Sequence, residues 1–356
     1  MMNKSKKHID QLYRGRIISR DATLSDALKL MDELDKKLLI ALEVNKFIGL
    51  LSIGDIQRAI IKNLPLNTHI ISILRKNIRI ANPSDSIEKI KKMMLEFRME
   101  LCPVVDETNK IIKVYYWEDL FVDQKIKPNK KFDLPVVIMA GGLGSRLKPL
   151  TNVLPKPLIP IYEKTMLEEI FDRFSEYGCK EFYVSVNYKS DLIEYYIKNQ
   201  ELPFKISFIR ESEPLGTAGS LSLFKDKFNQ TIFISNCDIL IDQDYSEILD
   251  YHRENKNKIT VVAALKHYSI PYGTLVTGDN GALESLDEKP ELTIKINSGM
   301  YIIEPDIIDI IPRNKHFHIT QLILNVKNNG GSVGVYPVSE KSWIDLGMWK
   351  EYMKYF

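Results

Sequence analysis

The chain has 356 residues, which is enough for two or three domains with buried cores. Hydrophobic residues make up 44% of it and the formal net charge is +2, so composition gives no argument for binding to nucleic acid or to a membrane surface. No apolar run approaches the ~18 residues that span a bilayer, and the N-terminal sequence MMNKSKKHID lacks the apolar core of a signal peptide. The three cysteines, Cys102, Cys179 and Cys237, are widely spaced, which is typical of reduced thiols in a cytoplasmic protein.

The first part of the chain contains a degenerate internal repeat. One copy runs from Ala22 to Ile60 and the other from Asp85 to Phe121. In each copy the hydrophobic pattern predicts an amphipathic helix and two short strands, after which an aspartate opens the next helix. These equivalent aspartates are Asp55 and Asp119.

The two copies resemble tandem CBS domains, which form an α+β module. Gly49, Ser52 and Asp55 approach the pattern G-x-[ST]-x-x-D, whose aspartate typically holds a ribose in this family. The resemblance implies an adenine nucleotide effector at Ser52 and Asp55, and at Asp119 in the second copy.

The second copy departs from this pattern, because Lys113 stands where the glycine would be and Tyr116 where the hydroxyl residue would be. Both aspartates also suit helix N-terminal capping, which is worth about 1 kcal/mol. An architectural or dimerising module therefore stays open beside nucleotide binding, and we expect a homo-oligomer.

A basic, polar and proline-bearing segment, KIKPNKKFDL at 125–134, separates two regions that differ in pattern. We therefore predict a first region at 1–124, with repeats at about 10–65 and 70–124, and a second region at 135–356.

The most informative stretch of the chain reads VVIMAGGLGSRLKPLTNVLPKPL, an apolar strand that leads into a glycine turn. Gly141, Gly142 and Gly144 have no side chains, so backbone N–H groups there can approach an anion closely. Arg146 and Lys156 add positive charge, and the stretch predicts a polyphosphate site at the carboxyl end of a strand. It matches neither the P-loop nor the dinucleotide-binding fingerprint.

Strand and helix patterns alternate after this stretch, which predicts an α/β fold with a mostly parallel sheet and a crevice at the strand ends. Thr165 and Glu168 predict a capping box for one helix, and the segment AGSLSLFKDKF is expected to form another. The pair Asn280–Gly281 predicts a hairpin turn.

The glycine-rich stretch resembles the opening motif of the sugar-1-phosphate nucleotidyltransferases, also called nucleoside-diphosphate-sugar pyrophosphorylases. The resemblance is carried by Gly141, Gly142, Gly144, Arg146, Leu147, Pro149, Leu150, Thr151, Pro155, Lys156 and Pro157. It covers 135–356 and implies a Rossmann-like α/β fold, a nucleoside triphosphate, a sugar 1-phosphate and Mg²⁺. The sugar phosphate would attack the α-phosphate of the nucleotide, and the catalytic residues Arg146 and Lys156 would neutralise phosphate charge.

Two acidic residues are candidate ligands for Mg²⁺. Asp238 ends the strand TIFISNCD, and Asp345 lies in WIDLG near the end of the chain. Hard oxygen ligands from two separate elements, completed by phosphates and water, suit Mg²⁺. The family usually has Gly-Asp where this chain has Cys237-Asp238, and a strand-end aspartate also occurs as a cap or turn residue.

The segment E-S-E-P-L-G-T-A-G is the candidate site for the base and ribose. It begins at Glu211; Gly216 and Gly219 allow close approach of a flat base, and Thr217 offers a hydroxyl group. The PLGTAG form resembles mannose-1-phosphate guanylyltransferases more than thymidylyl enzymes, which favours GTP as the nucleotide.

The resemblance places the sugar phosphate in three further segments. The residues expected to bind it are Tyr272, Gly273, Glu288, Lys289, Asn297 and Gly299. A glutamate can accept two hydroxyl hydrogen bonds while a neighbouring lysine meets a phosphate. For Asn297 to Gly299 a tight strand entry is the alternative, and His316 and His318 are expected to be capping or surface residues.

A CBS pair joined to a short transferase region is similar to the glucosamine-1-phosphate guanylyltransferases of bacterial legionaminic acid biosynthesis. That resemblance implies synthesis of GDP-glucosamine from GTP. Mannose-1-phosphate guanylyltransferase and UTP- or dTTP-dependent glucose-1-phosphate enzymes are alternatives. A non-catalytic adenine nucleotide sensor is the alternative from another class, and loss of Arg146, Lys156 or an acidic ligand would indicate it.

Overall fold

The structure is a computed structural model that describes residues 13–75, 78–97, 99–121, 128 and 130–355. The chain forms two compact units, Met1–Lys127 and Pro128–Phe356. The expected linker at 125–134 lies partly outside the described residues. Among the described residues, no helix is both long and apolar enough to cross a bilayer.

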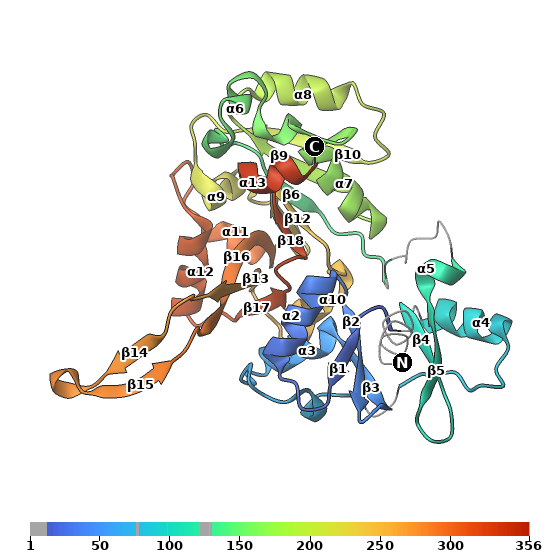
Figure 1. Cartoon of the computed structure of the whole chain (residues 1–356). Helices are drawn as coiled ribbons and strands as arrows, with labels where there is room; N and C mark the ends of the chain where they lie inside the picture. Colours follow the sequence, from blue (N-terminus) through green and yellow to red (C-terminus); the bar gives the residue numbers. More distant parts are fainter. Residues whose placement is uncertain (1–12, 76–77, 98, 122–127, 129, 356) are drawn as a thin grey trace. The chain divides into compact units, whose positions relative to one another are not determined.

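In the N-terminal unit each repeat builds its own small sheet (Figure 1). The first repeat has the strand order β1–β2–β3, and the second pairs β4 with β5. The strands are β1 (Ile17–Ser19), β2 (Leu38–Glu43), β3 (Lys46–Ser52), β4 (Leu101–Val105) and β5 (Ile111–Tyr116). The helices are α2 (Leu24–Leu34), α3 (Ile53–Ile61), α4 (Ile87–Phe97), α5 (Trp117–Leu120) and the 3₁₀ turn η1 (Ile70–Ser72).

The two repeats share one hydrophobic core. Ile40 and Phe47 of the first repeat cluster with Leu101 and Val114 of the second. Side chains alternate between the two faces of a strand, and the side chains on one face of these strands are buried together. The strands of both copies therefore contribute to one apolar layer. The repeats are therefore a single folding unit.

The C-terminal unit is built on a seven-stranded sheet in the order β10–β9–β6–β11–β16–β13–β17. The strands are β6 (Val136–Met139), β9 (Glu181–Val186), β10 (Lys205–Arg210), β11 (Ile232–Asn236), β13 (Ile259–Ser269), β16 (Glu291–Ile303) and β17 (Val333–Val338). All neighbouring pairs are parallel except those of β16, which runs antiparallel to β11 and β13. The predicted α/β fold with a mostly parallel sheet is thereby confirmed.

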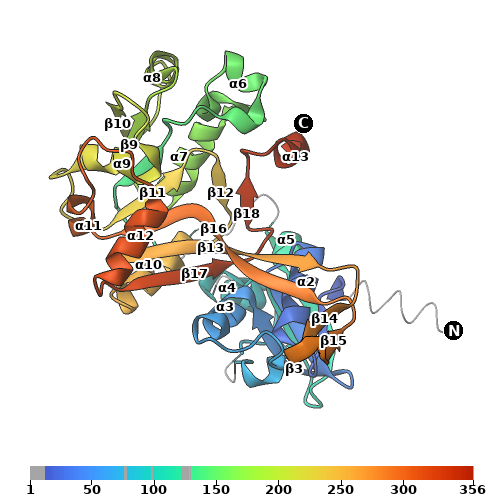
Figure 2. The same cartoon turned by 90° about the vertical axis from the view of Figure 1, so that its left-hand side faces the viewer.

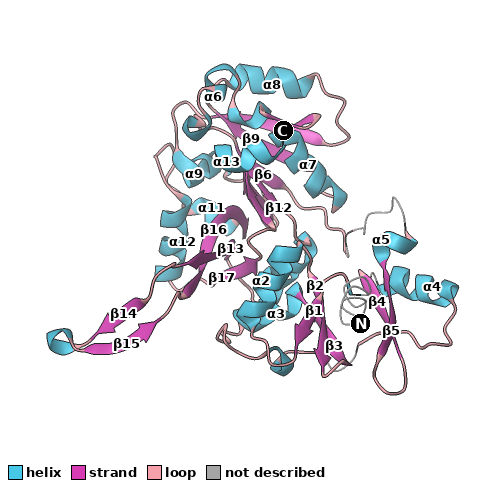
Figure 3. Ribbon diagram, viewed as in Figure 1, coloured by secondary structure: helices cyan, strands magenta, loops and turns pink. Residues whose placement is uncertain are grey.

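Helices cover both faces of this sheet, as the ribbon coloured by secondary structure shows (Figure 3). They are α6 (Leu150–Val153), α7 (Met166–Glu176), α8 (Ser190–Lys198), α9 (Gly216–Gly219), α10 (Tyr245–Glu254), α11 (Asp306–Asp309), α12 (Ile319–Asn328) and α13 (Trp349–Tyr352). On β11, Ile234 faces the cluster that includes α12, whereas Phe233 lies on the opposite face and meets Phe174 of α7 edge to face. This period of two is what a strand buried on both faces requires.

Short elements complete the unit. They are η2 (Ser145–Leu147), η3 (Lys156–Leu158), β7 (Pro160–Ile161), β8 (Lys164–Thr165), η4 (Ser220–Phe224), β12 (Ile239–Ile241), β14 (Thr274–Thr277), η5 (Asp279–Gly281), β15 (Leu283–Asp287), β18 (Trp343–Asp345) and η6 (Met353–Tyr355). The β14–β15 hairpin projects from the sheet (Figure 1), and its turn residues Asn280 and Gly281 both have positive φ angles, as the sequence predicts.

One expected helix is much shorter than predicted. The segment AGSLSLFKDKF forms only the end of α9 and the 3₁₀ turn η4. Lys225 is extended and Asp226 has a φ angle of 62°, so the backbone leaves the helical region after Phe224.

Candidate active site

The carboxyl ends of the parallel strands gather the candidate residues at one edge of the sheet. Asn236 of β11 pairs with Met139 of β6, which pairs with Ser185 of β9. The loops that follow these strands therefore start side by side. They hold the glycine turn, Lys189 and Asp238.

The glycine turn is an open backbone surface held in shape by its own neighbours. Gly144 has a φ angle of +63°, and a Cβ atom there would lie 2.7 Å from Thr151 Cγ2. The Thr151 hydroxyl donates to the Gly144 carbonyl at 3.0 Å. A Cβ on Gly142 would meet nothing within 4 Å. In the part of the chain that the structure describes, the N–H groups of residues 141–144 donate to no backbone carbonyl, so they are available to an anion.

Two cations and two carboxylates form one cluster beside this turn. Lys156 forms an ion pair with Asp238, and its side chain is 11% exposed. Arg146, at 59% exposed, lies 3.8 Å from Asp238 and 3.8 Å from Asp345. The structure thus brings together all four residues that the sequence analysis assigned to phosphate and metal.

Pairing of two short strands creates this cluster from distant parts of the chain. Ile239 of β12 pairs with Asp345 of β18, and the Leu346 N–H donates to the Asp238 carbonyl at 2.9 Å. Figure 2 shows the β12–β18 pair, with α13 following β18. Burial, followed by the nearby Asp238 charge, raises the pKa of Asp345.

The donor set at this cluster fits a hard divalent cation. Asp238 and Asp345 offer carboxylate oxygens, and the backbone opposite them is Gly347, where a Cβ would lie 2.4 Å from Asp238 Oδ2 and 3.0 Å from Asp345 Oδ1. The described residues contain no group of three or more His, Cys, Asp or Glu that could hold a metal. Two carboxylates completed by phosphate and water oxygens are the usual arrangement for Mg²⁺.

The predicted base segment folds against the loop that precedes α12. Ala218 and Gly219 donate to the Phe317 carbonyl, each at 2.9 Å. A Cβ on Gly216 would lie 2.9 Å from the Phe317 carbonyl oxygen, and one on Gly219 would lie 2.5 Å from that of Lys315. Packing with this loop therefore explains both glycines.

Thr217 belongs to the same packing. Its hydroxyl oxygen accepts the Ile319 N–H at 2.9 Å and so caps the first turn of α12. His318 is the N-terminal cap residue of this helix, as expected, and the His316 and His318 rings meet edge to face at 4.6 Å.

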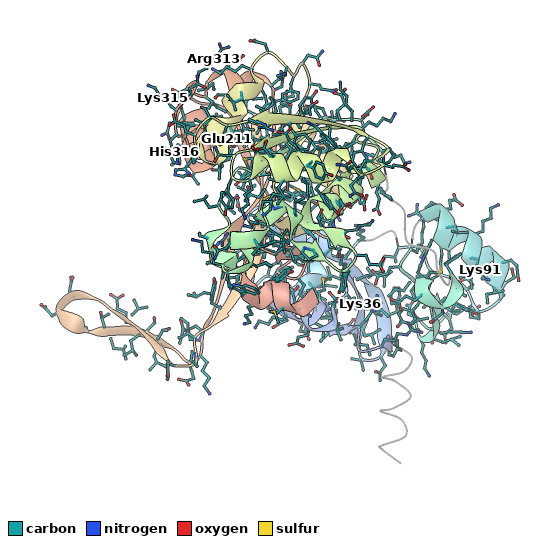
Figure 4. All side chains as sticks on the ribbon, turned by 90° about the horizontal axis from the view of Figure 1, so that it is seen from above. Lys36, Lys91, Glu211, Arg313, Lys315 and His316 are labelled. Atoms are coloured by element: carbon teal, nitrogen blue, oxygen red, sulfur yellow. The ribbon has the colours of Figure 1, made fainter. Side chains whose placement is uncertain are left out.

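Glu211 is a buried carboxylate at the inner end of this segment, 9% exposed. Its Oε2 accepts the Leu215 N–H at 3.0 Å, and its Oε1 would lie 2.4 Å from a Cβ on Gly141. Burial raises the pKa of this carboxyl group. Figure 4 shows Glu211 and His316 on the same side of the C-terminal unit.

The predicted sugar residues fall into two groups. Tyr272, Gly273 and Glu288 lie at the base of the hairpin, where a Cβ on Gly273 would come within 2.9 Å of Glu288 Oε2. Lys289 adjoins this group with a φ angle of 49°.

The second group lies on β16 near Asp238. Asn297 accepts the Gly299 N–H at 3.2 Å, and Gly299 packs on Asn236 at the end of β11, where a Cβ would come within 2.5 Å of Asn236 Nδ2.

Sequence analysis missed two groups that shape the site. Gly347 leaves room beside the carboxylates, and Lys189 donates to the carbonyls of Asn152 and Val153 at 2.6 and 2.7 Å, which holds the loop before Lys156. The only local signal for Gly347 is its position two residues after Asp345, and Lys189 has none, because its contacts cross 36 and 37 residues.

In the N-terminal unit, Asp55 is the centre of a polar cluster. It accepts the Ser52 N–H at 3.0 Å and its hydroxyl at 2.6 Å, accepts Arg75 Nε at 2.6 Å, and pairs with Arg58. Burial opposes ionisation, but hydrogen bonds from Ser52 and Arg75 outweigh it and lower the pKa of Asp55. Ser52 caps α3, so the capping interpretation also holds here.

Asp119 is engaged differently. The Arg14 guanidinium donates to both of its carboxylate oxygens at 2.7 Å and lies over the Tyr116 ring at 4.1 Å. The position equivalent to Asp55 is therefore already paired with a cation from the chain's own N-terminal segment.

Comparison with known proteins places this site in a family. The family model "Nucleotidyl transferase" matches residues 135–356, and the CBS domain model matches 16–62 and 70–122. The chain is 31% identical over 227 residues to the mannose-1-phosphate guanylyltransferase catalytic subunit beta of Dictyostelium discoideum. It is 29% identical over 230 residues to mannose-1-phosphate guanylyltransferase 1 of Arabidopsis thaliana.

Each of these matches covers 62% of this chain and 63% of the relative. The crystal structure of HddC from Yersinia pseudotuberculosis has 28% sequence identity and a TM-score of 0.49, over 62% of this chain and 97% of HddC. The match over 135–356 covers more than half of the 356 residues, and the chain belongs to the nucleotidyl transferase family, with two CBS domains before the transferase region.

Proposed function

We propose that the C-terminal unit transfers a nucleoside monophosphate from a nucleoside triphosphate to a sugar 1-phosphate and releases pyrophosphate, with Mg²⁺ as cofactor. The observation that carries this proposal is the cluster of Arg146, Lys156, Asp238 and Asp345 beside an open glycine turn. Both substrates are anions, so a site that gathers cations and metal ligands removes their repulsion.

We assign Lys156 and Arg146 to different phosphates because their side chains differ in exposure. Lys156 is nearly buried against Asp238, which supports a role for its ammonium group at the α-phosphate or the attacking phosphate. Arg146 is open to solvent, and its guanidinium suits the outer phosphates and the leaving pyrophosphate. A bound Mg²⁺, held by Asp238 and Asp345, would offset phosphate charge. Positioning and charge neutralisation suffice, because phosphoryl transfer needs no covalent nucleophile from the protein.

The roles of Arg146 and Asp238 are tested by substitution. We expect Arg146→Ala and Asp238→Asn each to lower turnover at least ~100-fold, because stabilisation of phosphate charge is lost. Pyrophosphate release measures the rate, and circular dichroism checks the fold.

Matched controls come from exposed ion pairs elsewhere in the unit. Arg210→Ala breaks a pair with Asp191 at 2.7 Å, and Asp172→Asn breaks one with Lys164. Both controls should keep wild-type turnover. Near-wild-type pyrophosphate release by Arg146→Ala or Asp238→Asn would reject the assigned roles.

Glu211 supports guanine as the base. An ionised carboxylate only accepts hydrogen bonds. The pairing edge of guanine offers two adjacent N–H donors, whereas those of uracil and thymine place one N–H between two carbonyl acceptors. Glu211 Oε1 faces the glycine turn, so an acceptor lies ready beside the proposed phosphate site. We therefore propose GTP as the nucleotide.

Glucosamine 1-phosphate is the proposed sugar, on the CBS-plus-transferase layout. Mannose 1-phosphate is the second candidate, because relatives at 28–31% identity are named mannose-1-phosphate guanylyltransferases. A matrix of GTP, UTP, dTTP and ATP against the 1-phosphates of glucosamine, N-acetylglucosamine, mannose and glucose decides between them. The pair with the highest kcat/KM identifies the substrates, and preference for UTP or dTTP would overturn the assignment of GTP.

For the N-terminal unit we propose an adenine nucleotide effector, whose ribose Asp55 would hold. Arg58 and Arg75 support this, because both guanidinium groups adjoin Asp55 and are more than half exposed, where phosphates could reach them. Arg14, which pairs with Asp119, is only 39% exposed, which favours one effector per chain. All three cysteines are buried free thiols, which supports the cytoplasm as the site of action.

A further inference from the structure

The short segment after Asp345 contacts the loop that carries Arg146 at more than one point. The Trp349 indole N–H donates to the Lys148 carbonyl at 3.1 Å. The Met348 sulfur lies 3.5 Å from Arg146 Nη1. The sequence does not predict these contacts, because they join positions 201 and 202 residues apart.

The same segment also carries the proposed metal ligand. Asp345 accepts the Gly347 N–H at 2.9 Å, and the adjacent Leu346 N–H donates to the Asp238 carbonyl. Trp349 follows Asp345 by four positions, and Lys148 follows Arg146 by two. The Trp349 hydrogen bond therefore ties the loop of the phosphate-binding cation to the segment of the metal ligand.

Trp349 is itself held in place. Its ring meets that of the buried Tyr352 edge to face, with centroids 5.9 Å apart. Trp349 is 37% exposed, so the part of its ring that is covered packs in place while its N–H reaches the Arg146 loop. An indole N–H is a donor only, and the Lys148 carbonyl supplies its acceptor.

We infer that Trp349 is a positioning residue that holds the Arg146 loop against the Asp345 segment, so that the phosphate-binding and metal-binding groups keep a fixed separation. This inference rests on the proposed function, since it assigns Arg146 to the nucleotide phosphates. A displacement of 1 Å at such a site is enough to lower catalysis.

The test compares two tryptophan-to-phenylalanine variants. W349F removes the bond to Lys148, and W343F removes an equivalent indole bond to the Ser298 carbonyl at 3.1 Å, beside the proposed sugar residues. We expect W349F to lower kcat/KM for the nucleotide about 3- to 10-fold, the value of one hydrogen bond. Its KM for the sugar 1-phosphate should stay unchanged, whereas W343F, whose lost bond lies beside the proposed sugar residues, should raise that KM.

A second measurement does not depend on activity. Trypsin can cut after Arg146 only when its loop opens, since Leu147 is fully buried. We expect W349F to speed cleavage of the Arg146–Leu147 bond about 3- to 10-fold, scored by mass spectrometry of the fragment that begins at Leu147. W343F should match the wild type.

Equal cleavage rates for W349F and wild type would overturn the inference, as would equally fast cleavage of the Arg146–Leu147 bond in W349F and W343F. If the wild type releases no pyrophosphate with any substrate pair, the proposed function fails. The cleavage assay then still decides whether Trp349 holds the loop.

Discussion

Gly347 shows how much a single missing side chain contributes to the site. A Cβ there would lie 2.4 Å from Asp238 Oδ2 and 2.7 Å from Lys156 Nζ, distances at which one group must move. We predict that Gly347→Ala lowers turnover at least ~10-fold, because the added methyl group displaces the charges that meet phosphate and metal. Pyrophosphate release at saturating substrates measures the effect.

Gly331→Ala is the control, because it is equally crowded but far from the site. Its Cβ would lie 2.6 Å from Val326 Cγ1 at the end of α12. Crowding there should lower the melting temperature and leave turnover unchanged. Unchanged turnover in Gly347→Ala would show that the cluster can rearrange around a methyl group.

Glu211, the residue proposed to recognise the base, is expected to lower the free energy of unfolding at neutral pH. Burial raises its pKa in the folded protein above the unfolded value of 4.5, so ionisation is disfavoured in the folded state. The cost is present above the folded pKa and disappears below pH 4.5, where both states are protonated; it amounts to about 1.4 kcal/mol for each pH unit by which the pKa is raised.

We predict that Glu211→Gln is more stable than the wild type at pH 7.5, and that the difference vanishes on acidification to about pH 4. The Gln carbonyl can still accept the Leu215 N–H. Thermal unfolding at both pH values measures this, and nucleotide kcat/KM should shift away from GTP in the same variant. Glu194→Gln is the control, because Glu194 is also 9% exposed. It is paired with Arg210 and Lys198, which lower its pKa, so this substitution should destabilise the folded protein at pH 7.5. A Glu211→Gln variant less stable than wild type at neutral pH would contradict the argument.

At the scale of elements, the base segment and α12 form one packed unit. Thr217 satisfies the first N–H of α12, a group that has no partner within the helix. We predict that Thr217→Val lowers the free energy of unfolding by about 1 kcal/mol, whereas Thr217→Ser keeps it, because only the hydroxyl oxygen matters. Urea denaturation of the three proteins measures the difference, and equal stability of Val and Ser variants would rule out the capping role.

This packing marks where sequence reasoning reached its limit. Local patterns predicted the Thr165–Glu168 capping box and the Asn280–Gly281 turn, because each depends on residues three or fewer positions apart. The same reasoning assigned Gly216 and Gly219 to a flat base, which stays a prediction; it did not predict that both glycines also pack on 315–317, about 100 residues away. No local pattern encodes that contact.

The proximity of the residues in the proposed catalytic cluster could be predicted because these residues have positional signals. Asp238 follows a buried strand, and parallel strands place their carboxyl ends together. The approach of Asp238 to Asp345 depends on the β12–β18 pairing, which joins segments more than 100 residues apart. The hydrogen bond from Trp349 to Lys148 depends on that pairing in turn. The sequence thus indicates which residues come together at the site, but not the contacts that support them.

At the scale of the whole molecule, the two repeats of the N-terminal unit differ in how open their charged groups are. The repeats share a core, but of their two equivalent aspartates only Asp55 has, among the described residues, guanidinium groups more than half exposed beside its carboxylate. At Asp119, Arg14 takes both carboxylate oxygens. An unequal pair of this kind should bind one ligand per chain, whatever the arrangement of the two units.

We predict that calorimetry on the full chain detects one adenine nucleotide per chain among AMP, ADP and ATP, and that Arg75→Ala weakens binding at least ~10-fold by removing a charge-assisted contact to phosphate. Arg20→Ala is the control, since Arg20 is a similarly exposed arginine of the same unit that pairs with Glu43.

If the effector regulates transfer, a coupling of about 1–3 kcal/mol changes the affinity for GTP ~5- to 150-fold, and GTP must change effector affinity by the same factor. Two equal sites, or no heat with any of the three nucleotides, would contradict the single-site prediction. Identical GTP affinity with and without bound effector would instead indicate that the N-terminal unit is an architectural module. Its shared core and its capped helix α3 are consistent with that interpretation.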